Sequence, residues 1–318
     1  MLSILLLIIG LVFVVKGADF LVDGASSLAK KYNIPNIVIG LTIVAFGTSA
    51  PELAVSAYSA YTGSSEIAIG NVVGSNIANI LLILGITAII NPLKVLKNTV
   101  QKEIPFALLS VIVLYFITND ILLDGASIDI ISLSDALILL SFMAVFLVYL
   151  IHLTKNTSDA DEIPIEDLPL WKSSFFIFIG LLGLLGGGKL FVDNAVEIAT
   201  LLGMSQAVIG ITIVAFGTSL PELATSVVAA MKKNSDIAVG NVVGSNIFNV
   251  FFVLGISGLV APLPKGGITN FDITIAIVSA LGLLLGSVLL VKNQLGRTEG
   301  IIFFTGYIAY IIYQLFAI

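Results

Sequence analysis

The chain has 318 residues, of which 58% are hydrophobic and only 11% are charged, with a mean hydropathy of +1.12 and a net charge of −6. This composition excludes an ordinary soluble domain, and the negative charge argues against a nucleic-acid partner. No cysteine is present, and neither a Walker loop nor a GxGxxG turn between strand and helix indicates a nucleotide site. We therefore expect an integral membrane protein that works in the lipid bilayer without nucleic acid, nucleotide or bound cofactor.

Ten apolar segments follow one another along the chain. Several are long enough to cross a hydrocarbon core of roughly 30 Å, which takes about 20 helical residues. The first segment has neither a preceding positive charge nor an evident cleavage site, so it is expected to stay in the protein as a helix. The predicted helices cover approximately residues 2–29, 37–60, 67–90, 104–118, 134–152, 173–200, 207–230, 237–260, 272–291 and 300–317.

An internal repeat relates the two halves of the chain at a constant offset of 170 residues. Residues 39–54 match residues 209–224 at 14 of 16 positions, and the sequence GNVVGSNI occurs at 70–77 and again at 240–247. Each half contains five predicted helices. Because five is an odd number, the second half must insert upside down relative to the first, which is the inverted-repeat architecture of secondary transporters.

The positive charges indicate the orientation, because cytoplasmic loops collect Lys and Arg. With the N-terminus outside, 11 of the 14 basic residues fall in inner loops, and only Lys265 falls in an outer one. We predict an all-α integral membrane protein of a plasma or inner membrane, with ten transmembrane helices and both termini outside. The first repeat covers residues 1–153 and the second 173–318. They are joined by a cytoplasmic linker at 154–172, whose five acidic residues lack the spacing of a calcium-binding loop.

Each half carries the sequence GTSxPE inside an apolar segment, at residues 47–52 and 217–222. Proline removes a backbone donor and clashes with the preceding turn, so each segment is expected to break or kink near its middle. Unpaired backbone groups are tolerated at membrane depth where they line a polar cavity. There the freed carbonyls, such as those of Ala45 and Ala215, can coordinate cations.

The two glutamates need a compensating charge, since an ionised side chain near the bilayer centre is disfavoured by roughly a few kcal/mol. No Lys or Arg lies near Glu52 or Glu222 in the same helices, so the partner is most simply a metal cation, or else protons. Oxygen-only ligands suit hard ions such as Ca²⁺ and Na⁺. Hydroxyls and amides at helical spacing supply further oxygens, at Thr48, Ser49, Ser75 and Asn79 and at Thr218, Ser219, Ser245 and Asn249.

Two weaker features accompany these motifs. The repeat-equivalent Asp23 and Asp193 lie near helix ends, where simple solvation and a role in ion entry or gating are both open. The glycines of the second motif form the small-residue pattern that packs membrane helices closely, at Gly70, Gly74, Gly240 and Gly244.

The paired GTSxPE motifs, each followed by GNxxGSNxxN, closely resemble the alpha repeats of the sodium/calcium exchangers within the cation/calcium exchanger superfamily. The likeness extends to the ten-helix plan without a large cytoplasmic domain, as in a microbial member. The resemblance implies a secondary antiporter that exchanges Na⁺ for Ca²⁺ by alternating access and electrogenically, with the first and sixth helices sliding across the remaining bundle. Ca²⁺ and Na⁺ would be its transported ions, and we expect it to work as a monomer.

The resemblance also implies roles for the polar residues. Glu52 and Glu222 would be the central ligands shared by Ca²⁺ and Na⁺, with a threonine beside each. The residues that would line the two mirror-related sodium sites and complete the cluster are Ala45 (carbonyl), Thr48, Ser49, Ser75 and Asn79 in the first half, and Ala215 (carbonyl), Thr218, Ser219, Ser245 and Asn249 in the second. Some relatives, typically the potassium-dependent ones, have Asp at the position of Asn249; asparagine there argues against potassium dependence.

Three alternatives remain. A proton/calcium antiporter of the same superfamily is the nearest, but its motif typically has Asn where this chain has Thr48-Ser49 and Thr218-Ser219, and hydroxyls favour sodium. An intramembrane enzyme would need an HExxH pair, a Ser paired to a His or an aspartate dyad, and the sequence shows none of them. A passive cation channel would dissipate a calcium gradient without needing sodium on the opposite side.

Overall fold

The computed structural model describes residues 2–156, 168–202, 215–289 and 293–317. Its first half contains, with η denoting a π-helical segment, α1 (Leu2–Lys31), α2 (Asn36–Ile39), η1 (Gly40–Val44), α3 (Ala45–Thr48), α4 (Ala50–Tyr61), α5 (Ser65–Ile77), η2 (Ala78–Leu84), α6 (Gly85–Ile90), β1 (Leu93–Lys94), η3 (Thr99–Glu103), α7 (Ile104–Ile117), α8 (Asp120–Asp124), β2 (Ile130–Ile131) and α9 (Leu133–Asn156). Its second half contains α10 (Leu170–Leu201), α12 (Ala215–Thr218), α13 (Leu220–Met231), α14 (Ser235–Ile247), η5 (Phe248–Leu254), α15 (Gly255–Val260), β3 (Leu263–Pro264), α16 (Asn270–Leu289), β4 (Gln294–Leu295) and α17 (Arg297–Ala317).

Within the described residues, eight helical segments are long and apolar enough to cross a membrane, and a ninth span is broken into residues 36–48 and 50–61 with a bend of 47°. The spans agree with nine of the predicted helices, to within a few residues at their ends. Of the remaining one, predicted at 207–230, residues 207–214 lie outside the described part, and α12 and α13 form the rest. The protein is therefore a multi-pass membrane protein.

The break in each repeat falls at the serine of GTSxPE. Ser49 has φ −82° and ψ 7°, and Ser219 has φ −86° and ψ 3°. The backbone therefore departs from α-helical geometry in the same way in both repeats. Pro51 and Pro221 then occupy the first turn of α4 and α13, where a missing N–H is tolerated. The predicted interruption is confirmed at both positions.

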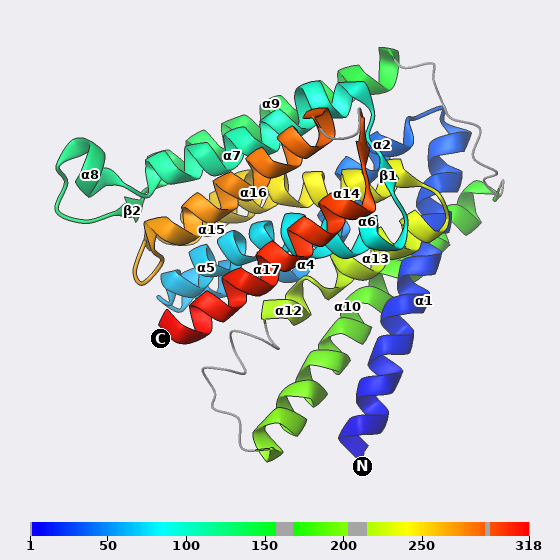
Figure 1. The fold of residues 1–318 in the computed structure, drawn as a ribbon, viewed down its shortest axis with the longest axis horizontal. Coiled ribbons are helices and arrows are strands. Elements are labelled where there is room, and N and C mark those ends of the chain that lie inside the picture. Colours follow the sequence, from blue (N-terminus) through cyan, green and yellow to red (C-terminus); the bar gives the residue numbers. More distant parts are fainter. Residues whose placement is uncertain (1, 157–167, 203–214, 290–292, 318) are drawn as a thin grey trace.

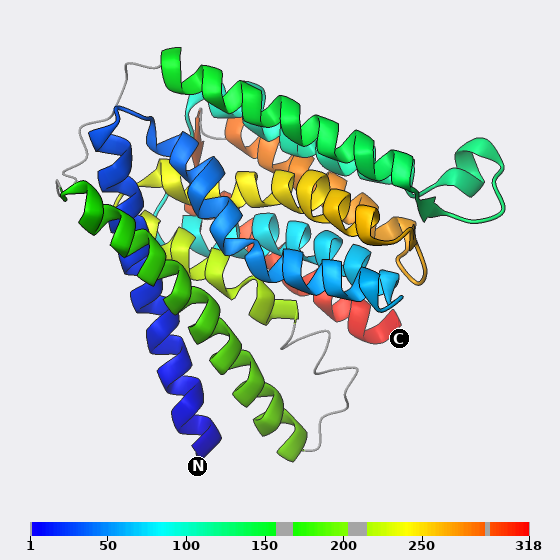
Figure 2. The same ribbon diagram turned by 180° about the vertical axis from the view of Figure 1, so that it is seen from behind.

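The two helices α1 and α10 are equivalent in the repeat and pack against each other along their length. A Cβ on Gly10 would lie 2.9 Å from the Gly187 carbonyl oxygen, and one on Gly17 would lie 2.7 Å from that of Gly180. Residue numbers rise along one helix as they fall along the other, so the pair is antiparallel, as inversion of the second repeat requires. Figures 1 and 2 show this pair crossing the other helices at a steep angle.

The centre of the bundle is formed by two equivalent spans, residues 65–90 and 235–260. Of their most apolar stretches, 78% and 83% of the residues are buried, against 17–44% for the other unbroken spans. Each span changes from α- to π-helical geometry in its middle, at η2 and η5. Such π segments are rare and occur often at functional sites.

Short strand pairs connect loops from different halves at opposite ends of the bundle. β1 pairs with β4, and β2 pairs with β3, both antiparallel. The loops joined by β1 and β4 are both predicted to be cytoplasmic, and those joined by β2 and β3 are both predicted to be outside. Beside β3, the buried Lys265 amine donates to Asn119 Oδ1 at 3.1 Å and to Asn270 Oδ1 at 2.6 Å.

Candidate cation-binding site

The two broken helices place Glu52 and Glu222 in the middle of the bundle. Each glutamate stands in the first turn of the helix that follows the break, and each is 1% exposed. The positive end of a helix dipole stabilises an anionic side chain at this position. None of the ion pairs among the described residues involves either glutamate. Among the residues that the structure describes, their charge therefore has helix termini but no basic side chain to balance it.

Hydroxyl groups from both repeats surround the two carboxylates. Ser75 donates to Glu52 Oε1 within its own repeat at 3.4 Å, whereas Ser49 donates across the repeats to Glu222 Oε1 at 3.3 Å. Thr218 also interacts with Glu52 and Thr48 with Glu222, again between repeats. The predicted site residues of the two halves thus form one interleaved cluster.

Four asparagines continue the cluster where α5 and α14 pass into π-helical geometry. Asn76 and Asn246 donate to each other's backbone carbonyls, both at 3.3 Å. Asn79 donates to Asn246 Oδ1 at 2.9 Å, and Asn249 donates to Asn76 Oδ1 at 3.1 Å. Asn79 and Asn249, which were predicted ligands, are therefore held by two residues that were not.

Several oxygens of the cluster are buried without any hydrogen-bond partner. In the part of the chain that the structure describes, eleven buried side-chain polar atoms lack a partner, and six of them belong to predicted site residues. Buried polar groups are usually satisfied, so such a concentration calls for a ligand. The six atoms are Glu52 Oε2, Asn79 Oδ1, Ser219 Oγ, Glu222 Oε2, Ser245 Oγ and Asn249 Oδ1.

The backbone carbonyls predicted to join the site lie beside the breaks. The expectation that the break frees the Ala45 carbonyl was wrong, because this carbonyl accepts from the Ser49 N–H at 3.0 Å and from the Thr48 hydroxyl at 3.3 Å. It stands one turn before the end of α3, whose C-terminal carbonyls carry the negative end of the helix dipole. Ala215 occupies the equivalent position as the first residue of α12.

Sequence reasoning missed Asn71 and Asn241, the first asparagine in each GNVVGSN motif. Asn71 donates to the Glu52 carbonyl at 3.3 Å, and Asn241 donates to the Glu222 carbonyl at 3.2 Å. Asn241 also accepts from the Thr48 hydroxyl at 3.0 Å. These amides fix the backbone that carries each glutamate. The exact repetition of the motif was the signal that could have identified them.

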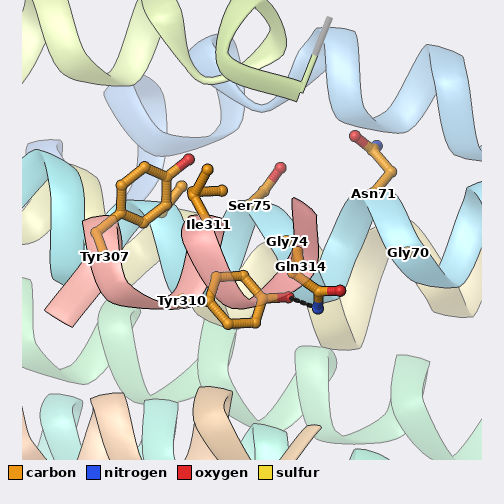
Figure 3. A pocket seen from close by; sticks show the side chains of 9 residues that line it. Gly70, Asn71, Gly74, Ser75, Tyr307, Tyr310, Ile311 and Gln314 are labelled. Carbon is orange, nitrogen blue, oxygen red and sulfur yellow. Dashed lines mark hydrogen bonds between the residues drawn. The ribbon is translucent and has the colours of Figure 1, made fainter. Parts of the chain in front are cut away.

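A cavity of about 220 Å³ lies between α5 and α17 and reaches the cluster at Ser75. Figure 3 shows Asn71 and Ser75 on α5 opposite Tyr307 and the hydrogen-bonded pair of Tyr310 and Gln314 on α17. Gly70 and Gly74 line the same cavity. Their counterparts Gly240 and Gly244 instead pack against α2, η1 and α3, where a Cβ would come within 3 Å of neighbouring atoms. For the second repeat, the predicted close packing is confirmed.

The two aspartates considered for gating have different surroundings. Asp23 on α1 forms an ion pair of 2.8 Å with Lys232, which follows α13, and Asp19 pairs with the same lysine at 3.3 Å. Asp193 on α10 pairs with Lys189 of its own helix at 2.9 Å. The ion pair of Asp23 therefore connects α1 to the end of α13 in the other repeat, whereas the ion pair of Asp193 lies within α10.

Comparisons with known proteins show the family to which the chain belongs. The family model described as sodium/calcium exchanger protein matches residues 2–152 and 172–316. The chain is 33% identical to the sodium/calcium exchanger MaX1 of Methanosarcina acetivorans, over 98% of this chain and 97% of that one. It is 37% identical to the inner membrane protein YrbG of Escherichia coli, over 82% and 81%.

A solved structure extends the likeness to the fold. The sodium-calcium exchanger NCX_Mj, in crystals soaked with Na⁺ and Ca²⁺, is 39% identical and superposes with a TM-score of 0.82, covering 98% of both chains. The match spans both repeats and the broken helices that carry the glutamates. The chain belongs to the sodium/calcium exchanger family.

Proposed function

We propose that this protein is a Na⁺/Ca²⁺ antiporter that binds its ions at Glu52 and Glu222. The observation that supports this proposal is the group of unpartnered buried oxygens around two carboxylates that form no ion pair with a described basic residue. Membership of the family makes the chain a cation/Ca²⁺ antiporter, that is, a transporter rather than an enzyme. The ion that drives calcium movement is the finer point, and we infer sodium from the hydroxyl groups of Thr48, Ser49 and Ser75 and their repeat equivalents.

The charge of the site accounts for exchange rather than leakage. Two carboxylates are neutralised by one Ca²⁺ or by two Na⁺, so the ions compete for overlapping oxygens. An empty site keeps two negative charges in a low-dielectric interior and is costly to carry across the membrane. Additional Na⁺ at the flanking serines would make the exchange electrogenic, so that inward sodium expels calcium.

We infer ten transmembrane helices with both termini outside. The strand pairs support this topology, since β1–β4 and β2–β3 each join loops that the distribution of basic residues assigns to one side. The topology places Asp23 and Lys232 at the cytoplasmic end of the bundle. Their ion pair ties α1 to the end of α13 and opposes the sliding of α1 that would open that end.

Calcium flux into proteoliposomes is expected to follow an imposed sodium gradient when pH is clamped on both sides. An outward sodium gradient should drive calcium uptake, and imposing a membrane potential should change its rate if more than two Na⁺ move per Ca²⁺. A passive channel would instead carry calcium without opposing sodium. A flux that follows a pH gradient and ignores sodium would identify the proton-coupled alternative and reject this proposal.

Replacement of Lys232 by methionine is expected to favour opening of the cytoplasmic end. Exposed ion pairs contribute about 0.2–1 kcal/mol, so the open population should rise by up to about fivefold. Because the chain has no cysteine, a single cysteine introduced at the buried Ala25 of α1 can report this opening through its alkylation rate. Lys233→Met removes the same charge from the neighbouring position and serves as the control. Equal alkylation in both variants would contradict the gating role of Asp23.

A further inference from the structure

We propose that Asn76 and Asn246 are positioning residues that orient the ion ligands Asn249 and Asn79 of the opposite repeat without binding an ion themselves. The proposal rests on the ion site described above and adds to it a pair of residues that direct its amide oxygens. It concerns the second asparagine, at the seventh position, of the motif GNVVGSN, which is repeated in both halves.

Asn76 and Asn246 form a reciprocal pair of hydrogen bonds. Asn76 Nδ2 donates to the Asn246 carbonyl and Asn246 Nδ2 to the Asn76 carbonyl, both at 3.3 Å. A backbone carbonyl can only accept a hydrogen bond. The amide nitrogen of each side chain must therefore face the opposite backbone, and its Oδ1 must face the other way.

The carbonyls of Asn76 and Asn246 lie at the ends of α5 and α14, next to the π segments. The π segments η2 and η5 begin two residues after Asn76 and Asn246 respectively. Bonding changes there from i→i+4 to i→i+5, a geometry that is found often at functional sites. The same change of geometry occurs in both spans, so the contact is symmetric between the repeats.

The oriented side-chain oxygens of Asn76 and Asn246 accept hydrogen bonds from the predicted ligands. Asn76 Oδ1 accepts from Asn249 Nδ2 at 3.1 Å, and Asn246 Oδ1 accepts from Asn79 Nδ2 at 2.9 Å. An amide oxygen cannot donate, so Asn249 and Asn79 must present nitrogen to their partners. Their own oxygens are directed elsewhere, and both are buried without a hydrogen-bond partner.

The segments that carry those oxygens pack against the helices that carry the glutamates. η5, which contains Asn249, packs against α4, which carries Glu52; η2, which contains Asn79, packs against α13, which carries Glu222. Asn79 also stands one helical turn after Ser75, whose hydroxyl donates to Glu52. Both orphaned amide oxygens thus come from the segments that adjoin the glutamates.

The side-chain oxygens of Asn76 and Asn246 are each engaged by an amide of the opposite repeat, unlike those of Asn79 and Asn249. They are 1% and 2% exposed, and each side chain uses its nitrogen on a carbonyl and its oxygen on an amide. Under the proposal, their effect on ion binding passes through the residues that they hold. Partners that orient a metal ligand typically contribute about 10–100-fold to affinity.

Double-mutant cycles of Ca²⁺ affinity test this inference. Calcium binding to the purified protein in sodium-free buffer is measured by calorimetry for Asn76→Ala, Asn249→Ala and the double variant. Each single substitution should weaken binding about 10–100-fold, and the double variant should be no weaker than Asn249→Ala alone, because one change acts through the other. The pair Asn246 and Asn79 should behave in the same way.

The pairs within one repeat are the matched controls. Asn76 with Asn79, and Asn246 with Asn249, lie within one turn of the same helix but share no hydrogen bond, so their effects should add. Additive effects in the cross-repeat pairs would overturn the proposal, as would unchanged affinity with a lowered melting temperature. The proposal would also be overturned if Asn76→Ala and Asn246→Ala both failed to assemble while the ligand variants assembled, because the two asparagines would then be needed for folding. A wild-type protein that binds no calcium would reject the proposed function instead.

Discussion

Replacement of Glu52 or of Glu222 by glutamine is expected to abolish sodium-driven calcium flux. Glutamine has nearly the same shape and keeps a carbonyl oxygen to accept from Ser75 or Ser49, but it removes one of two negative charges. Affinity of calcium sites varies over orders of magnitude with the charge of their ligands, so we expect binding to weaken at least about a hundredfold. The protein itself should assemble normally, because a neutral side chain is easier to bury than a carboxylate.

Flux in proteoliposomes and calcium binding by calorimetry measure this effect, and Glu103→Gln is its control. Glu103 is also 1% exposed and accepts from another side chain, the Tyr149 hydroxyl, but it is the last residue of η3 and not part of a broken helix. Its replacement should leave exchange intact. Normal flux in either site variant would remove the glutamates from the role of central ligands, and equal loss in Glu103→Gln would show that any buried acid is required for assembly.

The spans and the breaks in them could be predicted because their causes are local. Runs of apolar residues define the spans, and a proline with two hydroxyl residues before it defines each interruption. Repetition of the motif then showed that the two halves are equivalent. The structure reproduces these features, including nearly identical dihedral angles at Ser49 and Ser219.

The close packing of α1 against α10 could not be predicted in the same way. Glycines are spread along both helices, and only the three-dimensional arrangement shows that Gly10 faces Gly187 and Gly17 faces Gly180. The π segments are equally hidden, since η2 and η5 are ordinary apolar sequence. Both features depend on which backbone lies opposite, and that information is tertiary.

The residues of the site could likewise be predicted only in part. Residue type and helical spacing identified the oxygens that lie near each glutamate, but they did not reveal the crossing of the repeats. Ser49 donates to Glu222 rather than to Glu52, three residues along its own chain. Asn71 and Asn241 were passed over because their amides act on backbone carbonyls. A repeat offset alone does not define contacts between repeats.

The replacement Asn249→Asp is expected to make calcium exchange depend on pH in a way that the unmodified protein does not. Asn249 donates to Asn76 Oδ1, and Asn76 is itself fixed by the Asn246 carbonyl, so this oxygen remains an acceptor. A carboxyl group at position 249 can keep the bond only when protonated. At low pH the variant should therefore resemble the unmodified protein. As pH rises, the carboxyl group ionises and adds a third negative charge to the site. The carboxylate oxygen then faces Asn76 Oδ1, and neither oxygen can donate a hydrogen bond.

The ratio of variant to unmodified flux at each pH isolates this effect, because protons also compete at the two glutamates of both proteins. We expect the ratio to fall at least about tenfold from the acid to the alkaline side, since losing a hydrogen bond to a buried charged group amounts to about 1.5–3 kcal/mol. Asn249→Ala removes the ligand without adding a titratable group, so its ratio should be low at every pH. A ratio that does not change with pH would mean that Asn76 can rotate its amide and donate to the carboxylate. The asparagine contacts would then not restrict position 249 to a hydrogen-bond donor.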